Sequence, residues 1–288
     1  MTAQAITVTT PEGTIAGWRE GDGDTVAVLL HGGPGLSDLL ESLAELLGDD
    51  LTTIRFQQRG LPPTTIREPY TVEANVADAA AVIDQAAGGR AWIVGFSWGG
   101  HLALHMLVAC PERIAGAIII DPLGAFVEVM EEFGQNLTRS LDAEQAARIA
   151  EIDEREERGE SAPDDGIEWM RIAWPQYFAS PAAAPPMPPM QVNGACGVAT
   201  IASIHAHAEK RTLADGLPRV PPSLPVLFIH GTASPMPVRT STDTAALIPH
   251  AQVELIEQAG HFVWMEQPQR THAAIAPFVA AAVAPAAP

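Results

Sequence analysis

The sequence is poor in positive charge. Lysine and arginine together number 16, against 35 aspartates and glutamates, which gives a formal net charge of −19 over 288 residues. A surface of that sign repels the phosphate backbone of nucleic acids and the anionic surface of membranes. We therefore expect no nucleic-acid partner and no membrane partner.

Long hydrophobic runs are also missing. No apolar stretch approaches the roughly 20 residues that a membrane-spanning helix needs, although 47% of the residues are hydrophobic. Residues 1–13 contain neither the basic segment nor the apolar segment of a secretory signal. These absences predict a globular protein of the cytoplasm, and the sequence leaves its oligomeric state open.

Cysteine is scarce as well, since Cys110 and Cys196 are the only two. Two cysteines cannot form a disulfide framework or a four-cysteine metal site. Cys110 lies in an apolar segment that is typical of a packed helix, where thiols behave as small hydrophobic groups. We predict that both are free thiols.

The sequence does contain a series of short apolar runs. They are rich in β-branched residues, alternate with helical or turn segments, and comprise residues 26–30, 52–56, 91–94, 117–120, 226–230 and 253–256. Continuous apolar strands separated by helices are typical of a parallel sheet that is covered on both faces. The sequence therefore predicts an α/β fold. Residues 6–9 and 14–18 are less apolar and flank a Pro-Glu-Gly turn, which predicts an antiparallel hairpin at the sheet edge.

The alternation of strands and helices stops after Asp121 and resumes near Pro225. The segment between them holds a polar helical stretch at residues 141–160, a cluster of aromatic residues and the run PAAAPPMPPM. Residues 128–168 carry fourteen acidic residues against four arginines, as expected for solvated helix faces. We predict a core domain of residues 1–123 and 211–288, interrupted by an inserted, mostly helical cap of residues 124–210.

The segment GFSWGG, residues 95–100, follows the apolar run at residues 91–94 and precedes a helical-looking segment. In that context Gly-x-Ser-x-Gly forms a nucleophile elbow, a sharp turn that holds the serine oxygen at a helix N-terminus. The glycines let the strand and the helix approach closely. Ser97 is therefore the candidate nucleophile.

A glycine-rich loop, HGGPG at residues 31–35, follows the apolar run at residues 26–30. Acyl transfer needs preorganised donors for the oxyanion of its tetrahedral intermediate, and a backbone N–H of such a loop can supply one. Pro34 has no N–H. We therefore assign the oxyanion hole to the N–H groups of Gly33 and of Trp98, the residue after the candidate nucleophile.

His261 lies a few residues past the last apolar run, in the sequence QAGHFVWMEQP. A histidine this late in the chain fits the order serine, acid, histidine, and its imidazole can take a proton from Ser97 and return it to the leaving group. The other histidines fit no such role. His101 and His105 are predicted to share a helix without a third metal ligand, and His205 and His207 fall in the predicted cap, so we assign no metal site.

Together these motifs resemble the α/β-hydrolase superfamily. With the sequence QQRG at residues 57–60, HGGPG and GFSWGG are most similar to its proline iminopeptidase branch. The resemblance covers nearly the whole chain outside the predicted cap. It implies a mostly parallel, twisted sheet with helices on both faces and a serine hydrolase that needs no cofactor. The branch usually reads Asp-Gln-Arg-Gly-x-Gly where this sequence reads Gln-Gln-Arg-Gly-Leu-Pro.

The acid that orients the histidine departs from the family pattern. Family members usually place it after the strand that corresponds to residues 226–230, in a Gly-x-x-Asp pattern, and here that position holds Ser234. A hydroxyl cannot stabilise an imidazolium by charge. Some haloalkane dehalogenases carry the acid after the preceding strand, where this sequence has Asp121, so we propose Asp121 as the acid. Asp243 and Glu257 are poorer candidates, since they are expected mid-helix and at a strand end.

The sequence leaves three functions open. The first is an esterase or lactonase that acts on a small ester, lactone or amide through an acyl-enzyme intermediate. The second is an N-terminal proline aminopeptidase, whose substrate amine a cap carboxylate would bind. The third is a non-catalytic ligand-binding protein that has lost its acid. Dehalogenase and epoxide hydrolase activities are disfavoured, because the related enzymes have an aspartate at the elbow. Four cap aromatics are expected either to line the substrate pocket or to form the core of the cap: Trp169, Trp174, Tyr177 and Phe178.

Overall fold

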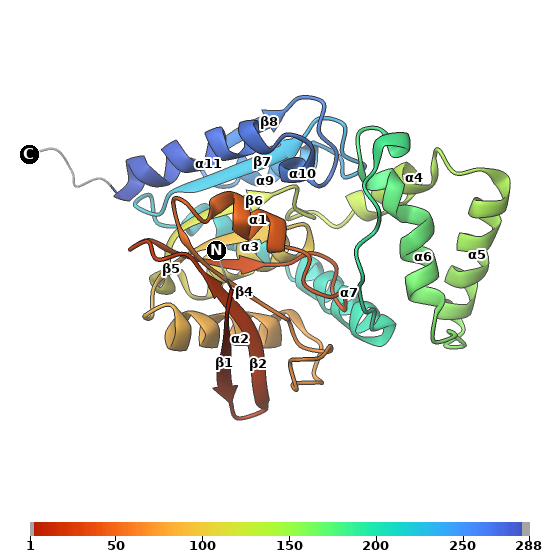
Figure 1. The fold of residues 1–288 in the computed structure, drawn as a ribbon, viewed down its shortest axis with the longest axis horizontal. Helices are drawn as coiled ribbons and strands as arrows, with labels where there is room; N and C mark the ends of the chain where they lie inside the picture. The colour runs from red at the N-terminus through yellow and green to blue at the C-terminus, as the bar shows by residue number, and fades with distance from the viewer. Residues whose placement is uncertain (1–2, 284–288) are drawn as a thin grey trace, which may run out of the picture.

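Eight strands form one sheet in the computed structural model, which describes residues 3–283 (Figure 1). The spatial order is β1-β2-β4-β3-β5-β6-β7-β8. The strands are β1 (Gln4–Thr10), β2 (Gly13–Glu20), β3 (Val26–Leu30), β4 (Thr52–Phe56), β5 (Ala91–Phe96), β6 (Ile114–Ile120), β7 (Val226–Gly231) and β8 (Gln252–Ile256). Strand β2 is antiparallel to β1 and to β4, and every other adjacent pair is parallel. This confirms the predicted α/β fold and its edge hairpin.

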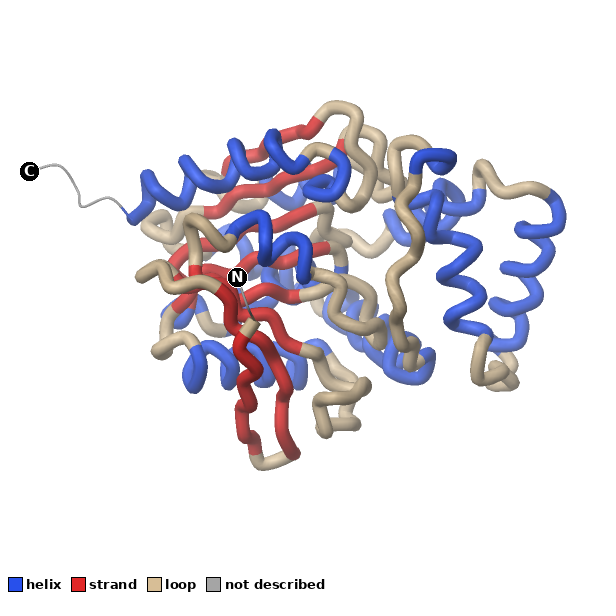
Figure 2. The backbone as a smooth tube through the Cα atoms, viewed as in Figure 1, coloured by secondary structure: helices blue, strands red, loops and turns tan. Residues whose placement is uncertain are grey.

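Helices cover both faces of the sheet (Figure 2). The longer ones are α1 (Glu41–Leu47), α2 (Val72–Ala86), α3 (Trp98–Ala109), α4 (Val129–Thr138), α5 (Ala143–Glu157), α6 (Asp165–Ala173), α7 (Gly194–Glu209), α9 (Arg239–Ala245) and α11 (Pro268–Val283); the shorter ones are α8 (Thr212–Gly216) and α10 (Val263–Glu266). No helix within residues 3–283 is both long and apolar enough to cross a membrane.

The core is divided by the sheet into two apolar layers. Strand side chains alternate between them, so that Val28 and Leu30 pack with α2 and α3, whereas Ala27 and Leu29 pack with α1 and α11. The predicted runs at residues 26–30 and 52–56 are strands with those bounds. Strand β8 differs from the expected fully buried strand, because it is the last strand of the sheet and leaves Val253 and Leu255 partly exposed.

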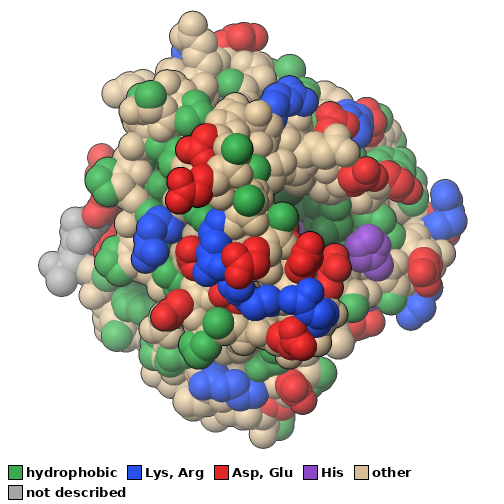
Figure 3. Space-filling view, turned by 90° about the vertical axis from the view of Figure 1, so that its right-hand side faces the viewer, with side chains coloured by type: hydrophobic (Ala, Val, Ile, Leu, Met, Phe, Trp, Pro, Cys, Tyr) green, Lys and Arg blue, Asp and Glu red, His purple; other side chains and the backbone are tan. Residues whose placement is uncertain are grey.

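Helices α4, α5 and α6, which lie between β6 and β7 in the sequence, are placed beyond the carboxyl ends of the central strands (Figure 1). The predicted polar helix corresponds to α5, which begins with a capping box between Asp142 and Gln145. Arg155 of α5 forms an ion pair with Asp165 of α6, so the acidic residues of this segment are solvated or paired. Figure 3 shows charges of both signs on this face around a recessed apolar patch. The division into core domain and cap stays a prediction, and residues 124–210 are called the insert below.

The contact between α3 and β3 generates a first test. A Cβ at Gly99 would collide with the carbonyl oxygen of Leu30, so we expect Gly99→Ala to lower the free energy of unfolding by about 3 kcal/mol. The matched control is Gly134→Ala in α4, where a Cβ meets nothing within 4 Å; it should raise that free energy by about 0.5–1 kcal/mol. Urea unfolding of both variants measures this, and equal midpoints would contradict the close contact.

Candidate active site

Four loops meet at the carboxyl edge of the sheet. They follow β3, β5, β6 and β8, and they carry HGGPG, Ser97, Asp121 and His261 respectively. After β3 the chain places β4 on one side and β5 on the other, and in open α/β sheets ligands bind in the crevice at such a switch point. A cavity of about 430 Å³ lies there between the sheet edge and the insert, and Gly33, Ser97 and His261 line it.

Ser97 occupies a strained turn between β5 and α3. Its φ of 55° and ψ of −118° lie where residues other than glycine are rarely found. Its N–H donates to the carbonyl of Ile120 at 3.0 Å, and its carbonyl accepts from His101 N at 3.1 Å. The strain is thus held by neighbouring backbone, and the side chain faces the cavity rather than either core layer.

The loop after β3 brings a bare backbone N–H to the same cavity. Gly33 has a φ of 60°, and a side chain there would collide with Leu36. Among the described residues, no acceptor binds the N–H of Gly33 or that of Trp98. Both residues line the cavity, so both N–H groups are available to a ligand oxygen.

Gln58 connects the loop after β3 to Trp98 at the start of α3 through hydrogen bonds. Its Nε2 donates to the carbonyl of His31 at 2.9 Å, and its Oε1 accepts from Trp98 Nε1 at 2.8 Å. Its own N–H donates to His31 Nε2 at 3.1 Å, so His31 is neutral with its proton on Nδ1, and burial lowers its pKa. Sequence reasoning used Gln58 only as part of a family motif and missed this bridge.

The structure brings Asp121 and His261 together. Asp121 lies directly after β6 with a φ of 44° and is 0% exposed. Its Oδ1 lies 2.6 Å from His261 Nδ1, and its Oδ2 accepts from Gly231 N at 3.0 Å. A carboxylate can only accept, so the proton lies on His261 Nδ1. Neither Asp243, in α9, nor Glu257, which accepts from Thr232, bonds to His261.

Aromatic rings and the insert fix the plane of His261. The ring lies between Phe96 and Tyr177, with centroid distances of 4.7 and 5.4 Å. Its backbone N–H donates to the carbonyl of Tyr177 at 2.7 Å. The hydrogen bonds of residues 3–283 leave His261 Nε2 without a partner, so this nitrogen is free to accept a proton.

The lining of the cavity is mostly apolar and includes three carboxylates, which are called the acidic rim below. The apolar lining includes Leu36, Leu39, Leu123, Met130, Phe133, Met236 and Phe262, and the three carboxylates are those of Asp153, Glu156 and Asp165. Of the four predicted aromatics, Trp169 and Tyr177 line the cavity. Trp174 and Phe178 are not among the lining residues, and both are buried against Phe262 in the core layer of α1 and α11.

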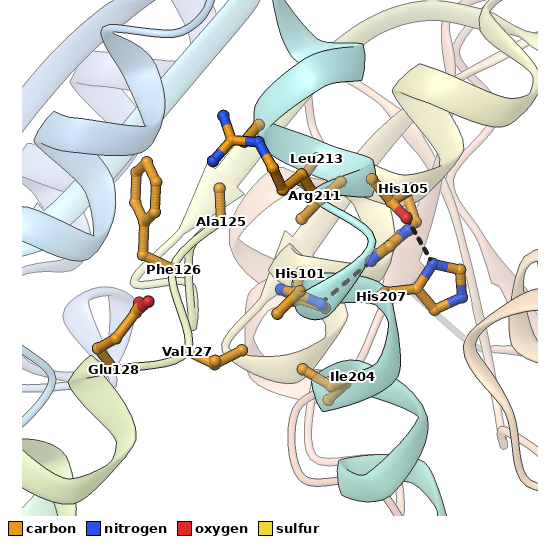
Figure 4. A pocket seen from close by; sticks show the side chains of 13 residues that line it. His101, His105, Ala125, Phe126, Val127, Glu128, Ile204, His207, Arg211 and Leu213 are labelled. Carbon is orange, nitrogen blue, oxygen red and sulfur yellow. Dashed lines mark hydrogen bonds between the residues drawn. The ribbon is translucent and has the colours of Figure 1, made fainter.

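A second, smaller cavity of about 80 Å³ borders three histidines (Figure 4). His101 and His105 come from α3, and their Nε2 atoms lie 3.2 Å apart. Sequence reasoning placed His207 apart from this pair, but α7 brings its ring to 4.7 Å from His105. Within residues 3–283 no group of three or more His, Cys, Asp or Glu side chains could hold a metal ion.

Cys110 and Cys196 are buried free thiols, as predicted.

Comparison with known proteins identifies the family. The sequence profile of the alpha/beta hydrolase family matches residues 27–274, and the chain belongs to this family. It is 39% identical over 54 residues to lipase LipV of Mycobacterium tuberculosis, covering 19% of this chain and 21% of the lipase. It is also 39% identical over 110 residues to proline iminopeptidase of Lactobacillus crispatus, covering 35% of this chain and 37% of that protein. The chain thus spans less than half the length of each of these relatives.

A similar fold occurs in the crystal structure of VinJ, with a TM-score of 0.72 and 20% identity, over 97% of this chain and 99% of that one. At this identity the likeness concerns the fold alone.

The histidine cluster generates a prediction about pH. Burial lowers the pKa of His101 to about 4 and that of His105 well below its usual value. Below about pH 6.5 these histidines are therefore protonated in the unfolded chain but stay neutral in the folded chain until the pH is much lower. The free energy of unfolding is therefore highest above that pH. It decreases as the pH falls, by about 1 kcal/mol per pH unit for each such histidine.

Urea unfolding at pH 7 and pH 5 checks this expectation. His105→Gln should flatten the loss of stability, and His205→Gln, at an exposed position on α7, should leave it unchanged. An identical loss in wild type and His105→Gln would contradict the assignment. His207 and Glu73 are neighbouring ionisable groups, with Nε2 and Oε1 3.0 Å apart, and Glu128 and Arg211 line the same cavity; all four stay in place in every variant.

Proposed function

We propose that this protein is a serine hydrolase that cleaves an ester or amide of a small substrate through an acyl-enzyme intermediate. The observation that carries the proposal is the 2.6 Å contact between Asp121 Oδ1 and His261 Nδ1, beside a cavity that His261 shares with Ser97. In this proposal Ser97 is the nucleophile, His261 the general base and Asp121 the orienting acid. The N–H groups of Gly33 and Trp98 form the oxyanion hole.

The reaction divides into two transfers. Ser97 Oγ attacks the substrate carbonyl while its proton passes to His261 Nε2, and the carbonyl oxygen becomes an oxyanion. When the tetrahedral intermediate collapses, the bond to the leaving group breaks and the imidazolium returns the proton to that group. Water then repeats the sequence on the acyl-enzyme and releases the acid. The buried Asp121 carboxylate stabilises the imidazolium in both halves.

The cavity favours a substrate with an apolar acyl group. The lining is mostly apolar, and no Lys or Arg of residues 3–283 lines the cavity, so an anionic substrate would find no counter-ion there. The volume of about 430 Å³ is in the range of small-molecule sites. We further propose that the insert acts as a cap, because it supplies the far wall of this cavity.

A fluorophosphonate tests the proposed nucleophile. Incubation should add one phosphonyl group to the wild type, as read by intact mass, and none to Ser97→Ala. Ser161→Ala is the matched control, since Ser161 lines the same cavity, and it should label like the wild type. Absence of an adduct on the wild type would reject the serine hydrolase and favour a ligand-binding protein.

A second candidate, an aminopeptidase that releases N-terminal proline, is favoured by the acidic rim. Asp165 is neutralised by Arg155 at 2.6 Å, and Asp153 accepts from Trp169 Nε1 at 3.0 Å. The carboxylate of Glu156 has no hydrogen-bond partner among the described residues, and partial desolvation raises its pKa. A bound ammonium would offset that cost, so Glu156 is the carboxylate that fits a substrate amine.

Paired substrates decide between the two candidates. If an amine binds at the rim, Glu156→Gln should raise KM for a proline arylamide by about tenfold and leave KM for a p-nitrophenyl acyl ester unchanged. Glu154→Gln, an exposed position on the same helix outside the cavity lining, is the control. Hydrolysis of the ester alone, with no effect of Glu156→Gln, would leave the esterase as the function.

A further inference from the structure

The position after β7, where the family pattern expects a carboxylate, is still connected to the acid. Ser234 Oγ lies 2.7 Å from Asp121 Oδ1 and accepts from Met236 N at 3.1 Å. A carboxylate oxygen can only accept, and the backbone N–H can only donate. The single hydroxyl proton of Ser234 therefore points at Asp121, across 113 residues of sequence.

Asp121 accepts hydrogen bonds from three donors. Its Oδ1 accepts from Ser234 and from His261, and its Oδ2 accepts from Gly231 N. Because the carboxylate is fully buried, these donors replace its hydration, and the loss of one is not made up by bulk water. Gly231 ends β7, Ser234 lies just after it, and His261 lies in the loop after β8. The carboxylate that follows β6 is therefore fixed by hydrogen bonds from the two elements that come later in the sheet.

We propose that Ser234 is a positioning residue of the catalytic acid: its hydroxyl fixes Asp121 Oδ1 toward His261 and takes up part of the charge of that oxygen. This inference rests on the proposed serine hydrolase. It also explains how the site tolerates a hydroxyl at the usual acid position, because that hydroxyl lies beside the acid–base pair, 2.7 Å from Asp121 Oδ1 and 3.5 Å from His261 Nδ1.

A purely structural role for Ser234 predicts different results. Its N–H donates to Gly231 O at 3.0 Å, and its hydroxyl closes a small turn with Met236. Loss of that turn alone would lower stability and leave the pH profile of the reaction in place. Loss of a donor to Asp121 would concentrate negative charge on Oδ1, hold the His261 imidazolium more strongly, and move the acid limb of the profile to higher pH.

The other ionisable groups near Asp121 and His261 are the same in the wild type and in the Ser234 variants. His230 Nε2 lies 3.6 Å from Asp121 Oδ2 and also contacts the carbonyl of Met236 at 2.9 Å. Tyr177 of the insert stacks on His261, and burial raises its pKa. Glu266 accepts from Gly260 N rather than from the imidazole.

The test follows the second-order rate of fluorophosphonate labelling against pH, which requires no known substrate. Ser234→Ala should lower the plateau rate by about tenfold and shift the acid limb upward, and Ser234→Thr, which keeps the hydroxyl, should restore both. A Ser234→Ala variant with the wild-type plateau and the wild-type limb overturns the inference while leaving the serine hydrolase intact. A wild type that is not labelled at Ser97 overturns the proposed function itself.

A swapped pair provides a second, independent readout. Since Ser234 Oγ is already within 3.5 Å of His261 Nδ1, an aspartate at that position reaches the imidazole. The double variant Asp121→Ser/Ser234→Asp should therefore be labelled at least about tenfold faster than Asp121→Ser alone. Equal labelling rates in the double variant and in Asp121→Ser, with both melting at the wild-type temperature, would show that a side chain at position 234 does not act on His261 or its acid. That result would overturn the inference.

Discussion

The hydrogen bond between Asp121 Oδ1 and His261 Nδ1 is the interaction on which the rest of the site depends. It joins the end of β6 to the loop after β8, with β7 between them. It can form because parallel strands deliver their carboxyl ends to one edge of the sheet. A fully buried carboxylate is stable only when its lone pairs are satisfied, and the loops after β7 and β8 supply the donors.

The same edge explains the geometry on the other side of the cavity. Glycine at position 99 lets α3 approach β3, and this contact holds Ser97 in its strained conformation. Gln58 then connects the loop after β3 to Trp98, so the two free N–H groups belong to one hydrogen-bonded unit. Tyr177 of the insert stacks on His261, and the insert also supplies the acidic rim of the cavity. The insert therefore contacts the residues to which the chemistry is assigned.

Local patterns in the sequence predicted the elements well. Strands β3 and β4 follow directly from apolar runs, and the elbow at Ser97 follows from glycine spacing after a strand. Asp121 is predicted as the acid from the missing carboxylate at position 234 and from the resemblance to haloalkane dehalogenases that carry the acid after the preceding strand. The bridge of Gln58, the bond from Ser234 to Asp121 and the packing of His207 on His105 were not predictable, because each joins residues far apart in sequence. Trp174 was assigned to the cavity because hydrophobicity alone does not distinguish a pocket wall from a core.

The most direct test of the central claim is the tautomer of His261, measured by 15N NMR of the histidine side chains in the wild type and in Asp121→Asn. The account predicts a proton on Nδ1 of His261 in the wild type and a change of that signal in the variant, because the amide no longer accepts with the charge of a carboxylate. An unchanged His261 signal in Asp121→Asn would show that another group orients the imidazole and would contradict the assignment of the acid to β6.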